Sequence, residues 1–280
     1  MCRTNESKPA DAGGCSEKTV ASASLGASQT ATSERKAVAV ELAEGYTTGK
    51  RVFETFEICV WFLALSAALW NVLSSVYLFQ YFPVVILGCF VGLCVSDVVT
   101  GVVHWSFDTW GTLEIPVIGQ SFIRSFREHH VDPFALTRHD FIQANADSSF
   151  LTTPMLAFLS RMTIADSADV FLHSYFISLL VLGTLTNQLH KYAHQLKPSP
   201  FVRFLQDLGI ILSRRSHSKH HRPPFDCAYC ITNGWFNPFL DRIQFWKRAE
   251  AFITAITGAI PRVDDAVWTN LVTFDESKTS

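Results

Sequence analysis

Residues 81–108, YFPVVILGCFVGLCVSDVVTGVVHWSFD, decide the fold class of this 280-residue chain. Over residues 81–103 the one charged side chain is Asp97, and the run is as long as the roughly 20 residues that a helix needs to cross the hydrocarbon core of a bilayer. His104 and Asp108 follow at once. The pattern predicts a membrane-spanning helix that carries chemically active side chains at its C-terminal end.

Two further runs match the first in length and in their lack of charge. Residues 58–79 contain no charged side chain, and residues 170–189 contain none when His173 is counted as neutral. A buried helix of a soluble enzyme can imitate one such run, but hardly three. Residues 148–160 form a shorter run that Pro154 interrupts, so that, taken alone, it fits a re-entrant or interfacial segment as well as a crossing.

The composition agrees with a lipid environment. Hydrophobic residues make up 48% of the chain and charged residues 17%, whereas soluble domains carry about 25% charged residues. The formal net charge of −2 gives no reason to expect a nucleic acid as a partner. The seven cysteines are scattered, without the dense regular spacing of a secreted disulfide framework.

The expected number of crossings follows from two histidines. His104 and His190 each lie at the C-terminal end of an apolar run, so they share one face of the membrane only if residues 148–160 also cross. Basic residues gather on that same face, and only Arg161 marks the second connection on the opposite face. By the positive-inside rule, the histidines and both termini are expected in the cytosol. The predicted fold is all-α, a multi-pass membrane protein with four transmembrane helices.

The chain divides into three predicted parts. Residues 1–44 are rich in Ser, Ala, Thr and Gly and are expected to be disordered, because they lack the apolar surface that would offset the entropy of ordering. A plastid transit peptide is the alternative, but such peptides are poor in the acidic residues that this tail contains. Residues 45–268 form the membrane-embedded domain, and residues 269–280 form a C-terminal tail.

Within the domain, residues 200–212 have apolar side chains at helical spacing, interrupted by charged and polar ones. This pattern predicts an amphipathic helix that lies on the membrane surface. A helix packed against the cytosolic part of the protein fits the pattern nearly as well.

Nine of the ten histidines fall in four short stretches of the chain. They are His104, His129, His130, His139, His190, His194, His217, His220 and His221. Residues three or four apart share a helix face, so HxxxH at 190–194 and HxxHH at 217–221 each present neighbouring imidazoles. Neutral imidazole suits iron, zinc and copper alike. Nine histidines exceed the three or four that one zinc ion needs, and they suit two metal ions with mainly nitrogen ligands.

Two acidic residues are candidates for supporting this metal site. Asp97, Gly101, His104 and Asp108 form one helical stripe. An acid inside a membrane crossing is costly and is therefore a functional candidate. Asp97 or Asp108 is expected to orient a ligating imidazole from outside the metal coordination sphere.

Other polar residues nearby have weaker claims to the metal. His139 lies in an Arg-His-Asp sequence that can equally pin a loop. His173 has no histidine partner in its crossing and is predicted to be structural. Cys227 and Cys230 form a lone CxxC beside the HxxHH motif. A single CxxC is weak evidence for zinc, and coincidence is the favoured interpretation.

Five segments of the chain resemble the lipid desaturase family of plasmanylethanolamine desaturases. They are GVVHWSFDTWG (101–111), FREHHVDP (126–133), TRHDF (137–141), TNQLHKYAH (186–194) and CITNGWFN (230–237). The similarity runs from about residue 45 to residue 268 and weakens over 148–180. The chain departs from the family at Ser216, where the family often has a further histidine that would be a peripheral ligand.

The resemblance implies a specific reaction. Members of this family introduce the vinyl-ether double bond into the 1-O-alkyl chain of an ether phospholipid, plasmanylethanolamine, and so form a plasmalogen. By analogy the nine histidines hold two iron ions, and all of them except His139 are expected to act directly in catalysis. The resemblance also implies molecular oxygen as co-substrate, electrons relayed by cytochrome b5 and an NAD(P)H-dependent reductase, and a location in the endoplasmic reticulum membrane.

Two other functions are compatible with the histidine clusters. The first is a related enzyme, either an acyl-lipid desaturase or a fatty-acid hydroxylase. The second is a membrane metal transporter or sensor, although transporter ligands usually lie within the crossings near the bilayer midplane. Because the histidines here lie at and beyond the ends of the apolar runs, a desaturase is the favoured interpretation.

Overall fold

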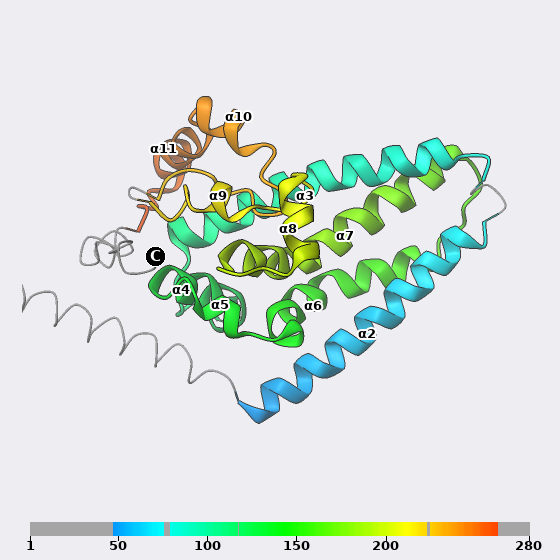
Figure 1. Cartoon of the computed structure of the whole chain (residues 1–280), viewed down its shortest axis with the longest axis horizontal. Coiled ribbons are helices and arrows are strands. Elements are labelled where there is room, and N and C mark those ends of the chain that lie inside the picture. Colours follow the sequence, from blue (N-terminus) through cyan, green and yellow to red (C-terminus); the bar gives the residue numbers. More distant parts are fainter. Residues whose placement is uncertain (1–46, 76–78, 117, 223–224, 263–280) are drawn as a thin grey trace, which may run out of the picture.

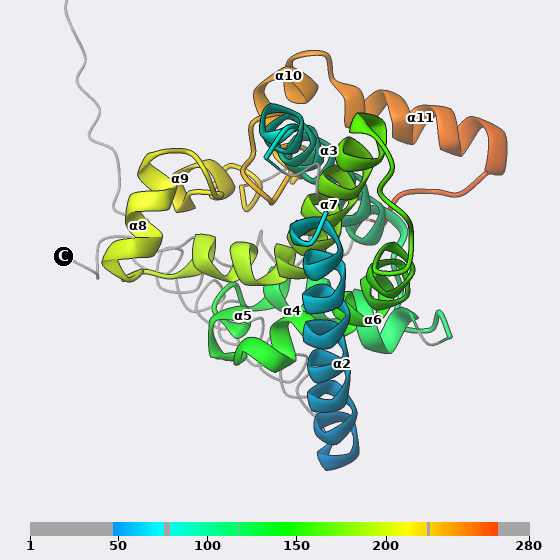
Figure 2. The same cartoon turned by 90° about the vertical axis from the view of Figure 1, so that its right-hand side faces the viewer.

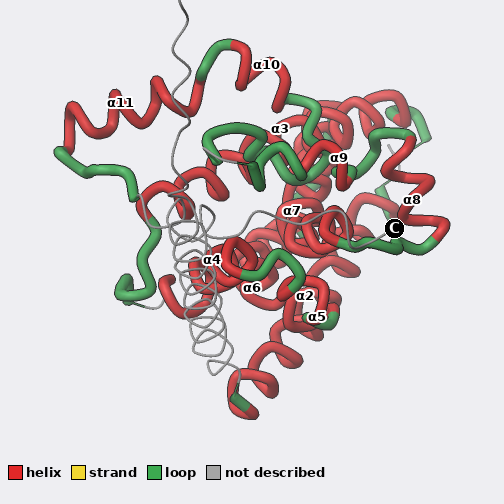
Figure 3. The backbone as a smooth tube through the Cα atoms, turned by 60° about the vertical axis from the view of Figure 1, so that its left-hand side comes forward, coloured by secondary structure: helices red, strands yellow, loops and turns green. Residues whose placement is uncertain are grey.

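The computed structural model describes residues 47–262 except 76–78, 117 and 223–224. Within that part the regular elements are all helices (Figure 3), which confirms the predicted all-α class for these residues. Four helices are long: α2 (Thr48–Leu73), α3 (Phe82–Trp110), α6 (Phe141–Leu159) and α7 (Ser167–His194). They lie side by side, and the shorter helices gather at one end of them (Figure 1). The predicted tails over 1–44 and 269–280 lie outside the described residues.

The shorter elements follow α3 and α7 in the chain. After α3 come the π-helix η1 (Gly119–Ile123), α4 (Arg124–Val131) and α5 (Ala135–Arg138). After α7 come α8 (Pro200–Asp207), α9 (Arg214–His217), α10 (Asn237–Arg242) and α11 (Phe245–Thr257). Viewed from the end of the long helices, α8 and α11 lie on opposite sides of the molecule (Figure 2).

Three of the described helices, α2, α3 and α7, are long and apolar enough to cross a membrane. They correspond to the three predicted long apolar runs, but their ends differ from those of the runs. Helix α2 begins at Thr48, well before residue 58, because the side chain of Thr47 caps it by accepting a hydrogen bond from the backbone N–H of Lys50 at 3.2 Å. It ends at Leu73 rather than at residue 79. Lack of charge therefore marks the part that suits lipid, whereas capping decides where the helix begins.

Small residues determine how α3 packs against α7. A Cβ atom at Gly88 would lie 2.8 Å from the carbonyl oxygen of Phe171, and one at Gly92 would lie 2.6 Å from that of Tyr175. The two backbones approach too closely for larger residues, as in other small-residue contacts between membrane helices. Because the contacts advance in the same direction along both helices, α3 and α7 are parallel. Their C-terminal ends, which carry predicted metal ligands, therefore lie at the same end of the bundle.

Helix α6 makes the return that two parallel helices require. It is antiparallel to α7, with Nδ2 of Asn145 3.4 Å from Oε1 of Gln188 and the hydroxyls of Thr152 and Thr184 2.6 Å apart. Its 19 residues correspond to about 28 Å at 1.5 Å per residue, and Pro154 lies inside it without ending it. Because it carries such polar side chains, α6 is not among the three helices that are apolar enough to cross. Four crossings therefore remain a prediction.

The predicted amphipathic helix over 200–212 is shorter than its apolar spacing suggested. Helix α8 ends at Asp207, and Gly209, with φ of +68°, then turns the chain. Phe201 and Phe204 are exposed while Val202 is buried. The phenylalanine face thus points away from the protein, which favours a position on the membrane surface over packing against the rest of the chain.

Candidate metal centre

Eight of the nine clustered histidines meet at the end of the bundle where the short helices gather. Helix α3 supplies His104, α4 supplies His129 and His130, α7 supplies His190 and His194, and α9 with the turn after it supplies His217, His220 and His221. Seven of the eight are buried, and His221 is partly exposed. Their ligand atoms form two groups in the described part of the chain; within each group these atoms lie within 4.8 Å of one another, and His129 belongs to both.

The first group, called here the five-histidine group, has the spacing of ligands on one metal ion. Its members are His129, His190, His194, His217 and His221. Nε2 of His217 lies 2.8 Å from Nε2 of His190. The same atom lies 3.0 Å from Nε2 of both His194 and His221. Two ligands at right angles, each about 2.1 Å from a metal as imidazole is from zinc, would lie about 3.0 Å apart. The residues therefore fit a metal ion.

The second group, called the His104 group, adds a carboxylate. Its histidines are His104, His129, His130 and His220. Oδ2 of Asp108, one turn after His104 on α3, lies 3.1 Å from Nε2 of His104 and 3.2 Å from Nε2 of His130. It lies 3.4 Å from Nε2 of His220. Asp108 thus aims an oxygen at the same point as three imidazoles, a geometry that fits a direct ligand as well as the supporting role predicted for it.

Backbone carbonyls orient two imidazoles of the His104 group. Nδ1 of His104 lies 3.1 Å from the carbonyl oxygen of Tyr229, and Nδ1 of His220 lies 3.0 Å from that of Cys227. A carbonyl oxygen only accepts hydrogen bonds, so each Nδ1 carries the proton and each Nε2 keeps its lone pair. Such bonds fix the tautomer and the ring orientation of metal-binding histidines.

Burial keeps these imidazoles neutral. Desolvation and the neighbouring imidazoles lower the pKa of His129, His217 and His221 well below the ordinary value of 6.5. The same causes lower the pKa of His220 to about 4. Nε2 of His129 is buried and has no hydrogen-bond partner among the described residues. Neutral imidazoles with inward-facing nitrogen atoms are the form that binds a transition metal.

The HxxHH motif is divided between the two groups. Helix α9 ends at His217, and turns follow through residue 221. His217 and His221 belong to the five-histidine group, whereas His220 belongs to the His104 group. Because the helix ends at His217, helical spacing does not fix the directions of His220 and His221, and the turns direct them into different groups. The predicted proximity is present, but the motif serves two sites.

Asp97 supports a loop instead of an imidazole. It is fully buried on α3, and its Oδ1 accepts hydrogen bonds from the backbone N–H groups of Asn233 and Gly234, each at 2.9 Å. Asn233 and Gly234 belong to the CITNGWFN segment, which directly follows Cys227 and Tyr229, the residues whose carbonyls bond to the imidazoles. Asp97 therefore anchors that segment to α3.

The remaining candidates lie outside both groups. Nε2 of His139 lies 3.5 Å from Oε2 of Glu128, and its carbonyl oxygen accepts a hydrogen bond from Nζ of Lys191. His173 is buried in α7, and its Nδ1 lies 2.7 Å from the carbonyl oxygen of Asp169. This placement agrees with a structural role. Cys227 and Cys230 belong to neither group among the described residues.

The sequence does not predict the contribution of the 227–230 backbone. The carbonyls of Cys227 and Tyr229 carry no mark in the sequence, because every residue has such a group. The segment CITNGWFN, one of the five that resemble the family, begins directly after these carbonyls and is a sequence signal near them.

Comparisons with known proteins agree with this site. A family model described as a lipid desaturase domain matches residues 93–264. The chain is 40% identical over 234 residues to plasmanylethanolamine desaturase 1 of Mus musculus, a match that covers 81% of this chain and 86% of that protein. It is 37% identical over 236 residues to plasmanylethanolamine desaturase of Myxococcus xanthus, covering 80% of this chain and 79% of that protein.

A more distant match is to chloroplastic fatty acid desaturase 4 of Arabidopsis thaliana, 32% identical over 176 residues, which covers 62% of this chain and 53% of that protein. No solved structure matches the chain. The family match covers more than half of the chain and includes all nine clustered histidines. The chain belongs to the lipid desaturase family and is a membrane oxidoreductase of the plasmanylethanolamine desaturase-like type.

Proposed function

We propose that this enzyme introduces the vinyl-ether double bond into the 1-O-alkyl chain of plasmanylethanolamine and so forms a plasmalogen. One observation carries the proposal: imidazoles from four segments converge in two adjacent groups at one end of a bundle of apolar helices. The identity of 40% and 37% to two proteins named plasmanylethanolamine desaturase supports this substrate over other lipids.

Two iron ions are the proposed cofactors, one for each histidine group. The ligands would be the eight histidines of the two groups, with Asp108 completing the His104 group. His139 was expected among the ligands, but it lies against Glu128, and we assign it to the support of the loop before α6. The neutral, mainly nitrogen donor set fits iron.

The chemistry requires such a cofactor. Removal of hydrogen from an unactivated CH₂ lies beyond any side-chain acid or base, and reduced iron supplied with molecular oxygen provides that power. The chain itself orients the imidazoles through the carbonyls of Cys227 and Tyr229. It also excludes water, since His104, His190 and His220 are at most 2% exposed. Cytochrome b5 and its NAD(P)H-dependent reductase are the proposed source of electrons.

The proposed topology has four crossings, with α6 as the fourth. The support for it is that α3 and α7 are parallel while α6 runs back alongside α7. The histidine groups and both termini would face the cytosol in the endoplasmic reticulum membrane. In a background without the native cysteines, a cysteine introduced at Met162, after α6, should resist an impermeant maleimide in sealed microsomes, while one introduced at Arg215 should react. The reverse pattern, with Met162 labelled and Arg215 protected, would contradict the fourth crossing.

Exposed basic residues beside the histidines would meet the lipid headgroup. They are Arg214, Arg215, Lys219 and Arg222. Basic side chains at the membrane surface attract anionic phosphate. The phosphate would then stay at the interface while the alkyl chain reaches the histidines at the end of the bundle.

The test is expression of the full chain in cells that lack plasmalogens, with acid-labile vinyl ethers measured by mass spectrometry. We expect plasmalogens to appear with the wild-type chain and to be absent with His220→Ala, which removes a ligand. Absence of vinyl ethers despite correctly located, metal-loaded wild-type protein would refute the assignment.

An acyl-lipid desaturase is the second candidate, because the chain also matches the Arabidopsis thaliana fatty acid desaturase. Incubation with paired alkyl and acyl phospholipids distinguishes the two activities. A new double bond in the acyl lipid alone would establish the second candidate in place of the first.

A further inference from the structure

Two imidazoles of the His104 group depend on one short stretch of backbone. The carbonyls of Cys227 and Tyr229 accept the Nδ1 protons of His220 and His104. Only Ala228 lies between these two carbonyls, so residues 227–230, called here the carbonyl loop, control the orientation of both rings together.

The carbonyl loop has a conformation that its own sequence does not favour. Ala228 has φ of +58°, in the left-handed region that residues with a Cβ atom rarely adopt. Such a conformation persists only where surrounding contacts enforce it. Ala228 is 1% exposed, and its backbone N–H donates to Oδ1 of Asp241 at 3.1 Å. The carboxylate of Asp241, on α10, therefore holds the loop at the residue between the two carbonyls.

A second side chain of α10 holds the end of the loop. Oδ1 of Asn237 accepts the backbone N–H of Cys230 at 2.9 Å, and Nδ2 of Asn237 donates to the carbonyl of Cys230 at 2.9 Å. On the opposite side, a Cβ atom at Gly101 of α3 would lie 2.7 Å from Sγ of Cys230. The loop is thus confined between α10 and α3, with little freedom to shift.

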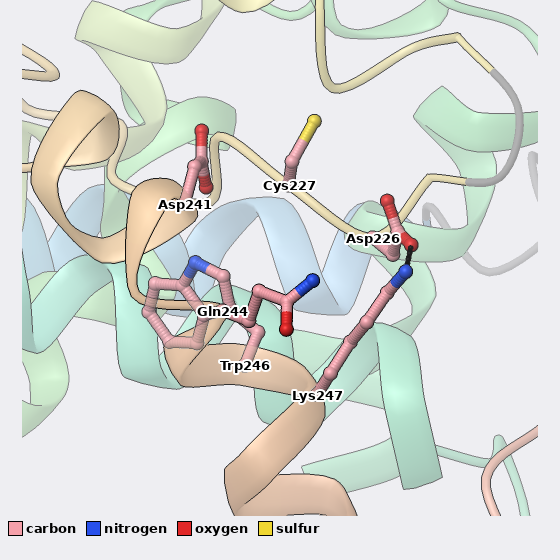
Figure 4. Close-up of a pocket in the computed structure, with 6 residues that line it drawn as sticks. All are labelled: Asp226, Cys227, Asp241, Gln244, Trp246 and Lys247. Carbon is pink, nitrogen blue, oxygen red and sulfur yellow. Dashed lines mark ion pairs between the residues drawn. The ribbon is translucent and has the colours of Figure 1, made fainter.

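Asp241 also lines a pocket beside the carbonyl loop. Asp241 and Cys227 line a pocket of about 110 Å³, whose other lining residues are Asp226, Gln244, Trp246 and Lys247 (Figure 4). Cys227 lines this pocket, and its carbonyl oxygen accepts the hydrogen bond from His220. Asp226 lines the same pocket, but its Oδ2 forms an ion pair with Nζ of Lys247 at 2.6 Å. The chain therefore offers two carboxylates in one pocket, of which Asp241 bonds to the loop amide.

We propose that Asp241 and Asn237 are positioning residues for the metal ion of the His104 group, acting through the carbonyl loop on the rings of His104 and His220. The inference rests on the proposed function only in requiring that the two histidine groups bind metal. Neither residue belongs to either histidine group. Loss of either would free the loop, turn the two imidazoles and weaken one metal site of the pair.

The test compares variants of the full chain, purified in detergent micelles and titrated with Fe²⁺ without oxygen. Metal per chain is counted by elemental analysis, and the dissociation constant of each site is measured by chelator competition. We expect Asp241→Ala to raise the dissociation constant of one site about tenfold or more, in the range typical of outer-shell partners, and to leave the other unchanged. Asp241→Asn keeps an oxygen acceptor and should therefore retain the wild-type dissociation constants at both sites. Asp226→Ala should also have the dissociation constants of the wild type.

The outcomes separate this inference from the proposed function. Two equally tight sites in Asp241→Ala would overturn the inference alone. Equal weakening of both sites in a variant of native helical content would also overturn it, because that result indicates a general structural role. A wild-type chain that binds fewer than two metal ions would overturn the proposed di-iron centre and the inference together. If Asp241→Ala does not fold, Asn237→Ser decides the question by the same criteria.

Discussion

A Cβ atom on Gly92 of α3 would lie 2.6 Å from the carbonyl oxygen of Tyr175 on α7. Real side chains do not approach a backbone oxygen that closely, so glycine at this position permits the contact between the two helices. The contact fixes the axial register of α3 against α7, and therefore which residues face each other at their C-terminal ends. There, the ring centroids of His104 and His190 are 5.4 Å apart. Helix packing near one end of the bundle thus brings together ligands at the other.

The first prediction concerns this contact. Gly92→Leu should separate α3 from α7, lower the thermal midpoint of unfolding and reduce metal binding at both histidine groups. Overpacking of this kind costs about 1–3 kcal/mol. Gly183→Ala is the matched control, because a Cβ atom at Gly183 of α7 meets nothing within 4 Å. A Gly92→Leu variant with unchanged midpoint and metal content would show that the close approach does not set the register.

The second prediction concerns Asp108 as a ligand. Its Oδ2 lies within 3.4 Å of Nε2 in three histidines of the His104 group. Asp108→Ala should weaken metal binding at that group by more than the roughly 10- to 100-fold typical of partners outside the coordination sphere, because it removes a ligand oxygen. The five-histidine group should keep its metal. Chelator competition measures both sites, and undiminished affinity in this variant would exclude Asp108 from the centre.

The third prediction separates His139 from the histidines of the two groups. His139 lies against Glu128 and outside both groups, so His139→Ala should retain two metal ions. His190→Ala should lose the metal of the five-histidine group, because it removes a nitrogen 2.8 Å from Nε2 of His217. Elemental analysis of the purified variants checks both. Loss of a metal ion from His139→Ala would return His139 to the ligand set.

The fourth prediction concerns the metal-free protein in acid. Burial lowers the pKa of His220 from 6.5 to about 4, so between these pH values the unfolded chain binds more protons than the folded one. Stability should therefore fall as the pH drops through this range, by about 3 kcal/mol from His220 alone. Thermal unfolding at pH 7.5, 6 and 5 measures the trend. His220→Asn, which does not titrate, should show a smaller decline; an equal or steeper decline would contradict the neutral, buried state of this ring.

The fifth prediction concerns Ala228 and its φ of +58°. Ala228→Gly should keep both metals, because glycine adopts positive φ without steric cost. Ala228→Val should disturb the carbonyl loop and weaken the His104 group, since a β-branched residue is strained in this region. Metal titration and thermal unfolding of the two variants provide the comparison. Equal behaviour of the two would mean that the conformation of Ala228 does not matter for the site.

Much of the site was predictable from local sequence, because its chemistry is marked by rare residues. Nine histidines within short stretches indicated two metal ions, and the apolar runs indicated three of the four long helices. The spacing did not predict that His220 belongs to a different group from His217 and His221, because helical spacing indicates only that side chains share a face. Nor did it separate His139 from the other eight histidines, since its loop is placed by contacts with Glu128 and Lys191.

The sequence by itself determined that the chain contains helices suited to lipid and that histidines lie near the C-terminal ends of two of them. Hydrophobicity and residue type are local properties, and they survive in any arrangement of the helices. Only the tertiary structure decided which imidazoles lie close enough to share a metal ion, because that depends on the parallel packing of α3 and α7 through Gly88 and Gly92. It also decided that the backbone of residues 227–230 fixes two rings, since a carbonyl group becomes a specific partner only when the fold brings it within hydrogen-bond distance.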